Sequence, residues 1–174
     1  LLVIATIPAM CAGLLLQNSI ESTFTIHTVK WMLLLTGLIV GGTYFFNNQS
    51  NRKIVLIIAI CMGLVQTLAL LPGISRSGIT ISAALIMGAQ HQKAAKFAFY
   101  MAIPILFGAG LLQLINIEPQ NNISTFHLII GFFSSAITGY LVISWLIGVI
   151  SQGKFYLFSL YCFGISILTF TIIN

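Results

Sequence analysis

Acidic residues are nearly absent from this sequence of 174 residues, which contains only two, Glu21 and Glu118. Charged residues of either sign make up 5% of the chain, whereas 59% of its residues are hydrophobic. A soluble domain of this length cannot bury so much apolar surface and has too few charged side chains to cover the rest. The composition therefore excludes an ordinary soluble enzyme and predicts a protein of the lipid bilayer.

Cysteine is also scarce, and Cys11, Cys61 and Cys162 are widely spaced among apolar residues. Their odd number and spacing exclude a CxxC redox pair and a cysteine zinc site, so we interpret them as small buried side chains. The formal net charge is +5. No basic run with interleaved aromatic residues accompanies this charge, so we expect a membrane rather than a nucleic acid as the partner.

Five apolar stretches are long enough, or nearly so, to cross a bilayer as helices, which takes roughly 20 residues. They are Leu1–Leu16, Trp31–Phe46, Phe97–Ile115, Phe126–Ile150 and Phe155–Ile173. Short polar loops separate them, and no linker or low-complexity tract divides the chain. We predict an all-α polytopic membrane protein with about five transmembrane helices, in which residues 1–174 form a single membrane domain.

A different pattern occupies the middle of the chain. Ile54–Leu71 is apolar, the string PGISRSG follows it, and Ile79–Ala89 is apolar but too short to span comfortably. Pro and Gly are expected to end the first helix, and Ser77 to cap the second. This pattern predicts a re-entrant helix, turn and half-helix beside a cavity, because a bilayer tolerates irregular backbone and arginine only there. An ordinary hairpin with an exposed loop remains the alternative.

The distribution of basic residues predicts the orientation in the membrane. Loops on one side of the predicted bundle contain Arg52, Lys53, Lys93, Lys96 and Lys154. Lys30 is the basic residue of the opposite side, where Glu21 and Glu118 also fall. Because cytoplasmic loops carry an excess of Lys and Arg, the first side is predicted to be cytoplasmic.

The string LPGISRSGIT, from Leu71 to Thr80, contains the groups of an anion site. The planar guanidinium of Arg76 matches phosphate oxygens, and the hydroxyls of Ser75, Ser77 and Thr80 can donate to the same group. The amides and the positive dipole end of the second half-helix also favour an anion, and Gly78 keeps the backbone open to a ligand. These features predict phosphate binding, although a serine cap with Arg76 reaching lipid headgroups remains the alternative.

The longer string GLVQTLALLPGISRSGITIS, Gly63 to Ser82, resembles the PGxSRSxxT motif of the undecaprenyl-diphosphate phosphatase family, also called bacitracin-resistance proteins. The resemblance continues through TIPAMCAGLLL, KFAFYMAIPILFGA and GFFSSAITGYLVISWLI and covers nearly the whole chain. It implies a multi-pass enzyme of the bacterial inner membrane. Such an enzyme hydrolyses undecaprenyl diphosphate to undecaprenyl phosphate and so recycles the lipid carrier for cell-wall synthesis.

The resemblance also implies site residues and an inverted-repeat fold with two re-entrant helix pairs. Arg76 would hold the diphosphate, Ser75 and Ser77 would contact it, and Thr80 would complete the site. The neighbouring residues implied to bind substrate are Gln66, Gly73 and Gly78. This chain would correspond to the C-terminal two thirds of the family, with the first re-entrant segment and first transmembrane helix expected upstream of Leu1.

One family signature, a glutamate-rich E-x-x-x-E stretch followed by serine and histidine, has no match in this sequence. The implied divalent ion, Mg²⁺ or Ca²⁺, is therefore expected to find its ligands upstream of Leu1. Glu21 and Glu118 are interpreted as solvated loop residues, and the three histidines, His27, His91 and His127, as interface residues. We accordingly expect residues 1–174 alone to bind the lipid weakly and to be catalytically inactive.

Two alternative functions stay open at this point. The first is a transporter or flippase of the lipid carrier, since re-entrant helices and inverted repeats also occur in transporters. The second is a non-catalytic membrane subunit in which the motif has no chemical role. The sequence does not give the oligomeric state, and a homo-oligomer is left open.

Overall fold

The computed structural model describes residues 1–16, 20, 22–49, 52–115 and 125–172. In this part of the chain the regular secondary structure is helical, apart from one isolated bridge between Arg52 and Ala89. Four stretches are long and apolar enough to cross a membrane: Ile26–Phe46, His91–Gln113, Phe126–Ser151 and Phe155–Ile172. The predicted all-α membrane fold is therefore confirmed.

The helices are α1 (Leu2–Leu15), α3 (Ile26–Gly42), α4 (Leu56–Leu68), α5 (Arg76–Ile86), α6 (His91–Ile115), α7 (Thr125–Ser151) and α8 (Phe158–Ile172). Two 3₁₀ helices, Thr43–Gln49 and Phe155–Leu157, follow α3 and precede α8. The first stretch expected to span forms α1, whose 14 residues fall short of a spanning length. Helices α4 and α5 are also short and apolar.

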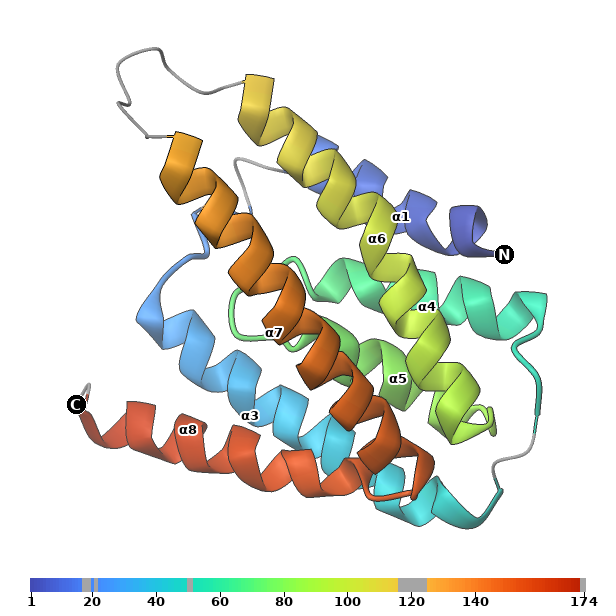
Figure 1. Cartoon of the computed structure of the whole chain (residues 1–174). Helices are drawn as coiled ribbons and strands as arrows, with labels where there is room; N and C mark the ends of the chain where they lie inside the picture. The colour runs from blue at the N-terminus through green and yellow to red at the C-terminus, as the bar shows by residue number, and fades with distance from the viewer. Residues whose placement is uncertain (17–19, 21, 50–51, 116–124, 173–174) are drawn as a thin grey trace.

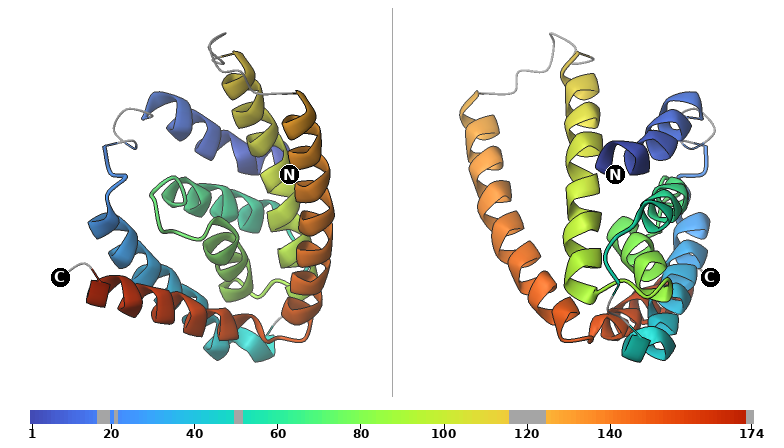
Figure 2. Two further views of the ribbon diagram at one scale, coloured as in Figure 1. Left: turned by 60° about the vertical axis from the view of Figure 1, so that its left-hand side comes forward. Right: turned by 90° about the vertical axis from the view of Figure 1, so that its right-hand side faces the viewer.

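Helix α5 lies at the centre of the arrangement (Figure 1). It packs against α4, α6 and α3, while α8 pairs with α3 and α1 pairs with α4. Helix α7 lies on the outer side of α6, away from α1 and α4 (Figure 2). Side chains along α7 such as Phe132 (68% exposed) and Tyr140 (74% exposed) are left uncovered by the described residues, as expected of a surface that faces lipid.

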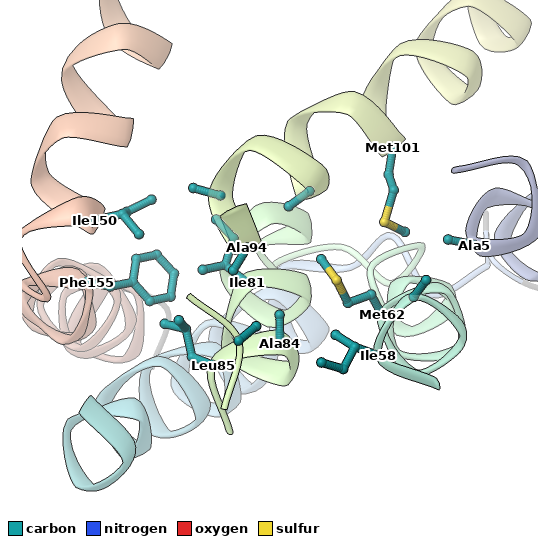
Figure 3. Packing of buried hydrophobic residues seen from close by; sticks show 14 of the residues in the cluster. Ala5, Ile58, Met62, Ile81, Ala84, Leu85, Ala94, Met101, Ile150 and Phe155 are labelled. Atoms are coloured by element: carbon teal, nitrogen blue, oxygen red, sulfur yellow. The ribbon is translucent and has the colours of Figure 1, made fainter. Parts of the chain in front are cut away.

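The hydrophobic core gathers around α5 (Figure 3). Ile81 and Leu85 of α5 meet Ile58 and Met62 of α4 in one cluster of buried side chains. Alanines supply much of the rest: Ala5, Ala59, Ala84, Ala89, Ala94, Ala95 and Ala98. Small residues let helices approach closely in a membrane, where packing rather than exclusion of water drives association. The core therefore holds α5 in place, and with it the turn that precedes α5.

The segment predicted to be re-entrant is a helix, a turn and a second helix. The turn lies between the two ends of α6 and α7 rather than beyond them (Figures 1 and 2). Helix α4 has 13 residues and α5 has 11, so neither reaches a spanning length. This geometry agrees with a re-entrant segment and not with a hairpin whose loop emerges on the far side.

The boundaries of this segment differ from the prediction. Helix α4 ends at Leu68, before Pro72 and Gly73, because Ala69, Leu70 and Leu71 form successive turns whose amides donate three residues back. Helix α5 begins at Arg76, ahead of the apolar stretch that starts at Ile79, and its N-cap is Ser75. The prediction that Ser77 caps this helix was wrong, since Ser77 lies inside its first turn.

Three connections gather at one end of the helices (Figure 1): the chain before α4, the α5–α6 turn and the α7–α8 turn. The backbone of Arg52 bonds to Gly88 and Gln90, which ties the first connection to the second. Lys93 lies in the first turn of α6 and Lys154 in the α7–α8 turn. The basic loops thus share one end, as predicted, and its assignment to the cytoplasm stays a prediction.

Candidate functional site

The turn before α5 is fixed by α3. Gly73 has φ of +94°, and a Cβ added there would lie 2.6 Å from the carbonyl oxygen of Val29, so glycine is required. The fully buried Thr36 of α3 places its hydroxyl at the turn, where Oγ1 accepts from the Ser75 amide at 3.2 Å. Sequence reasoning missed Thr36, because no local pattern indicates that α3 packs here.

The start of α5 is held by a side-chain cap. Ser75 Oγ accepts a hydrogen bond from the Gly78 amide at 3.1 Å, which satisfies one of the donors left free at the helix start. A Cβ on Gly78 would lie 2.9 Å from Ser75 Oγ, so glycine makes room for the cap. Ser75 and Gly78 therefore shape the backbone at the site.

Arg76 lies in the first turn of α5, and its guanidinium is fixed from two other helices. Gln66 of α4, 2% exposed, accepts from Arg76 through Oε1, with Nε at 3.0 Å and Nη2 at 2.6 Å. The carbonyl oxygen of Met101 in α6 accepts from Nη2 at 2.7 Å. A guanidinium has five N–H donors, so these bonds leave the two on Nη1 for a ligand.

The remaining hydroxyls of the motif differ in what they face. Thr80 is buried, and its Oγ1 donates to the carbonyl of Arg76 at 2.8 Å within the helix. The half-buried Ser77 lines the cavities on both sides of the motif, and its hydroxyl has no hydrogen-bond partner among the described residues. Thr80 therefore bonds within its own helix, whereas Ser77 is free to meet a ligand and Ser75 keeps its hydroxyl proton for one.

Two cavities meet at Ser77. One, of about 350 Å³, lies between the turn and helices α3, α7 and α8, and includes Thr36, Gly73 and Ser75 in its lining. The other, of about 380 Å³, lies between the start of α5 and helices α6 and α7, and Arg76 lines it. Gln66 and Thr80 line neither of these two cavities. The motif thus presents Arg76 and Ser77 to a space large enough for a ligand.

The charge of this site is positive and uncompensated within the described residues. Arg76 is half-buried, and the acceptors it meets, Gln66 and Met101, are neutral. A buried cation without a counterion is costly, so the site favours an anion. The two acidic residues, Glu21 and Glu118, lie outside the described residues.

The residues of the site do not fit a divalent metal ion. No group of three or more His, Cys, Asp or Glu side chains that could hold an ion occurs in the described ranges. Mg²⁺ and Ca²⁺ need several oxygen ligands, usually carboxylates. The charged and serine side chains of the motif that line the cavities, the Arg76 guanidinium and the hydroxyls of Ser75 and Ser77, are donors suited to an anion.

The chain is similar in sequence to known proteins. Residues 1–168 match the family described as bacitracin resistance protein BacA. The chain is 34% identical over 174 residues to the Undecaprenyl-diphosphatase of Methanothermobacter thermautotrophicus, covering 97% of this chain and 96% of that protein. Against the Undecaprenyl-diphosphatase of Methanobrevibacter smithii it is 35% identical over 177 residues, covering 97% of this chain and 62% of the relative.

A further relative, Undecaprenyl-diphosphatase 1 of Halalkalibacterium halodurans, is 34% identical over 180 residues, which cover 99% of this chain and 65% of that protein. The chain therefore spans less than two thirds of the length of these last two relatives and nearly all of the first. Taken together, these matches and the helical membrane fold show that the chain belongs to the bacitracin resistance protein BacA family.

Proposed function

We propose that the protein hydrolyses undecaprenyl diphosphate to undecaprenyl phosphate in the inner membrane and so recycles the lipid carrier for cell-wall synthesis. The names of the three relatives support this reaction. The observation that carries it is the half-buried Arg76, which neutral acceptors hold with Nη1 left free and which lines one cavity together with Ser77. These donors suit the phosphate groups of the lipid, and the turn lies between the two ends of α6 and α7, so the rest of the lipid can stay in the bilayer.

In this function Arg76 binds the diphosphate through Nη1, and Ser77 donates its hydroxyl to the same group. Helix α5 directs its free N-terminal amides and positive dipole end toward the anion. Preorganised donors stabilise the charge that develops on the transferred phosphoryl group without reorganising during the reaction. Gln66 and Met101 prevent the guanidinium from turning away.

Hydrolysis adds water to the terminal phosphorus and breaks its bond to the bridging oxygen, which leaves with the lipid monophosphate. The described residues bind and orient the diphosphate but provide no carboxylate to activate that water. We propose that the divalent ion expected for this reaction, Mg²⁺ or Ca²⁺, takes its carboxylate ligands from outside the described residues.

The test is phosphate release from undecaprenyl diphosphate by membranes that contain the whole protein as expressed. Arg76→Lys keeps the charge but loses the fork that Gln66 and Met101 hold, so turnover should fall about tenfold or more, equivalent to ~1.4 kcal/mol. Arg52→Lys, at an exposed arginine outside the cavities, is the matched control and should keep full activity. Normal turnover by Arg76→Ala would contradict the proposal, and lipid movement without phosphate release would favour a transporter.

A further inference from the structure

We propose that the cavity between α6 and α7 binds the isoprenoid chain of a polyprenyl diphosphate next to its diphosphate. We define the α6–α7 groove by Ala98, Ala102, Ile103 and Leu106 of α6 and Ile143 of α7, which line this cavity together with Arg76. The inference rests on the proposed function, since it places the lipid chain relative to the diphosphate at Arg76. The groove would then decide which lipid tails the site accepts.

The chemistry of the groove is that of a site for an anionic amphiphile. Its cationic end is Arg76, followed by the hydroxyl of Ser77, and every other lining residue is apolar. A ligand that satisfies both parts needs a compact anionic head joined directly to a hydrocarbon chain. A polyprenyl diphosphate has this structure, whereas inorganic diphosphate would leave the apolar part unfilled.

Small side chains on α6 create the width of the groove. Ala98 and Ala102 are four residues apart and therefore lie on one face of the helix, one turn after the other. Each alanine leaves space that a larger residue would fill, and isoprene units need such width because each carries a methyl branch. We infer that Ala102, which is only half-buried, limits the size of the first isoprene unit.

The groove is open along its length rather than closed. Ile103 is 62% exposed and Leu106 is 67% exposed on α6, and Ile143 is also exposed on α7. Beyond this level α6 and α7 continue as two long apolar helices, with α7 on the outer side of α6 (Figure 2). A long polyprenyl chain can thus enter the groove with its first units and continue into the bilayer.

The experiment measures binding, so that it does not depend on turnover. The whole protein in lipid nanodiscs is titrated with farnesyl diphosphate and, separately, with inorganic diphosphate. Ala102→Phe should lower the affinity for farnesyl diphosphate at least tenfold and leave that for inorganic diphosphate within about twofold. Ala109→Phe is the matched control, because Ala109 is exposed on the same helix and outside the groove lining.

Equal binding of farnesyl diphosphate by Ala102→Phe would overturn the groove as the isoprenoid site and leave the proposed function intact. Failure of the unaltered protein to bind inorganic diphosphate in an Arg76-dependent way would instead overturn the proposed function, and this inference with it. If a folded Ala102→Phe protein bound neither farnesyl diphosphate nor inorganic diphosphate, the groove would also be rejected as the isoprenoid site, because the substitution would then affect more than binding of the tail.

A second measurement tests the groove without adding a large side chain between the helices. Ile143→Cys is introduced into a protein whose native cysteines, Cys11, Cys61 and Cys162, are replaced by alanine. Farnesyl diphosphate should slow maleimide labelling of this cysteine several-fold, whereas inorganic diphosphate should not. Equal protection by both ligands would show that the tail does not reach the groove. Protection by phospholipid alone, unchanged by farnesyl diphosphate, would show that an ordinary membrane lipid occupies it.

Discussion

Gln66 Oε1 accepts two hydrogen bonds from Arg76, one from Nε and one from Nη2, although ten residues and a tight turn separate the two in sequence. Arginine is only a donor, so the carboxamide must present its oxygen. Its nitrogen, Nε2, is then buried without a partner among the described residues. Gln66 thus points its oxygen at Arg76 and leaves its own amide nitrogen without a partner among the described residues. This is expected of a residue that positions the guanidinium.

Gln66→Ala should therefore weaken Arg76-dependent binding of inorganic diphosphate about tenfold, because hydrogen bonds to a charged group contribute ~1.5–3 kcal/mol. Titration calorimetry in nanodiscs checks the affinity, and Gln92→Ala, at an exposed glutamine of α6, is the control. Rescue of binding by free guanidinium ion distinguishes a positioning role of Gln66 from a merely structural one. Free guanidinium ion should restore binding to Arg76→Ala but not to the Gln66→Ala, Arg76→Ala double variant, and equal rescue of both would contradict a positioning role.

Alanine substitutions of the two serines of the motif should affect different properties, stability at Ser75 and diphosphate affinity at Ser77. Ser75→Ala removes the N-cap of α5 and should lower the free energy of unfolding by ~1 kcal/mol. Ser77→Ala removes a hydroxyl without a partner among the described residues, so it should leave stability unchanged and reduce diphosphate affinity several-fold. Thermal denaturation and titration of both variants measure the two effects. The reverse assignment, with Ser77 stabilising and Ser75 binding, would show that the site adopts another geometry.

Gly73→Ala should destabilise the protein by ~1–3 kcal/mol, because φ of +94° is strained for any residue with a Cβ. The added methyl would also press on the Val29 carbonyl. Gly131→Ala in α7 is the control, since a Cβ there meets nothing within 4 Å and alanine favours a helix. Equal melting temperatures for the two variants would contradict the fixed turn.

Metal removal should separate binding from cleavage. EDTA should abolish phosphate release if the reaction uses the proposed divalent ion. Binding of inorganic diphosphate should stay within about twofold, because the proposed ligands of the anion, Arg76 and Ser77, bind no metal ion themselves. Residues 1–174, which contain only two acidic side chains, should alone release no phosphate. Robust Arg76-dependent release by this chain would show that further carboxylates are dispensable.

The exposed basic residues Arg52, Lys93 and Lys154 should be accessible from one side of the membrane, since their loops lie at one end of the helices. Single cysteines at these positions, in the background without native cysteines, should react with a membrane-impermeant maleimide in inverted vesicles only. Labelling of any one of them in intact cells would contradict the proposed orientation.

The sequence by itself determined the membrane class, the long apolar helices and the polar segment that we propose as the site. These follow from composition and local pattern: an apolar run of sufficient length must be helical in a bilayer, and Arg76 between two short apolar arms must have a site. The position of Gly73 in the turn could also be predicted, because only glycine readily takes its backbone conformation.

Only the tertiary structure decided which partner each polar group of the candidate site contacts. Met101 lies 25 residues from Arg76 and Thr36 lies 39 residues from Ser75, so neither contact leaves a local trace in the sequence. The capping of α5 by Ser75 rather than Ser77 depends on where the turn is anchored by α3. Those contacts arise when α3, α4 and α6 pack around α5, and helix packing depends on side chains far apart in the chain, which no local pattern records.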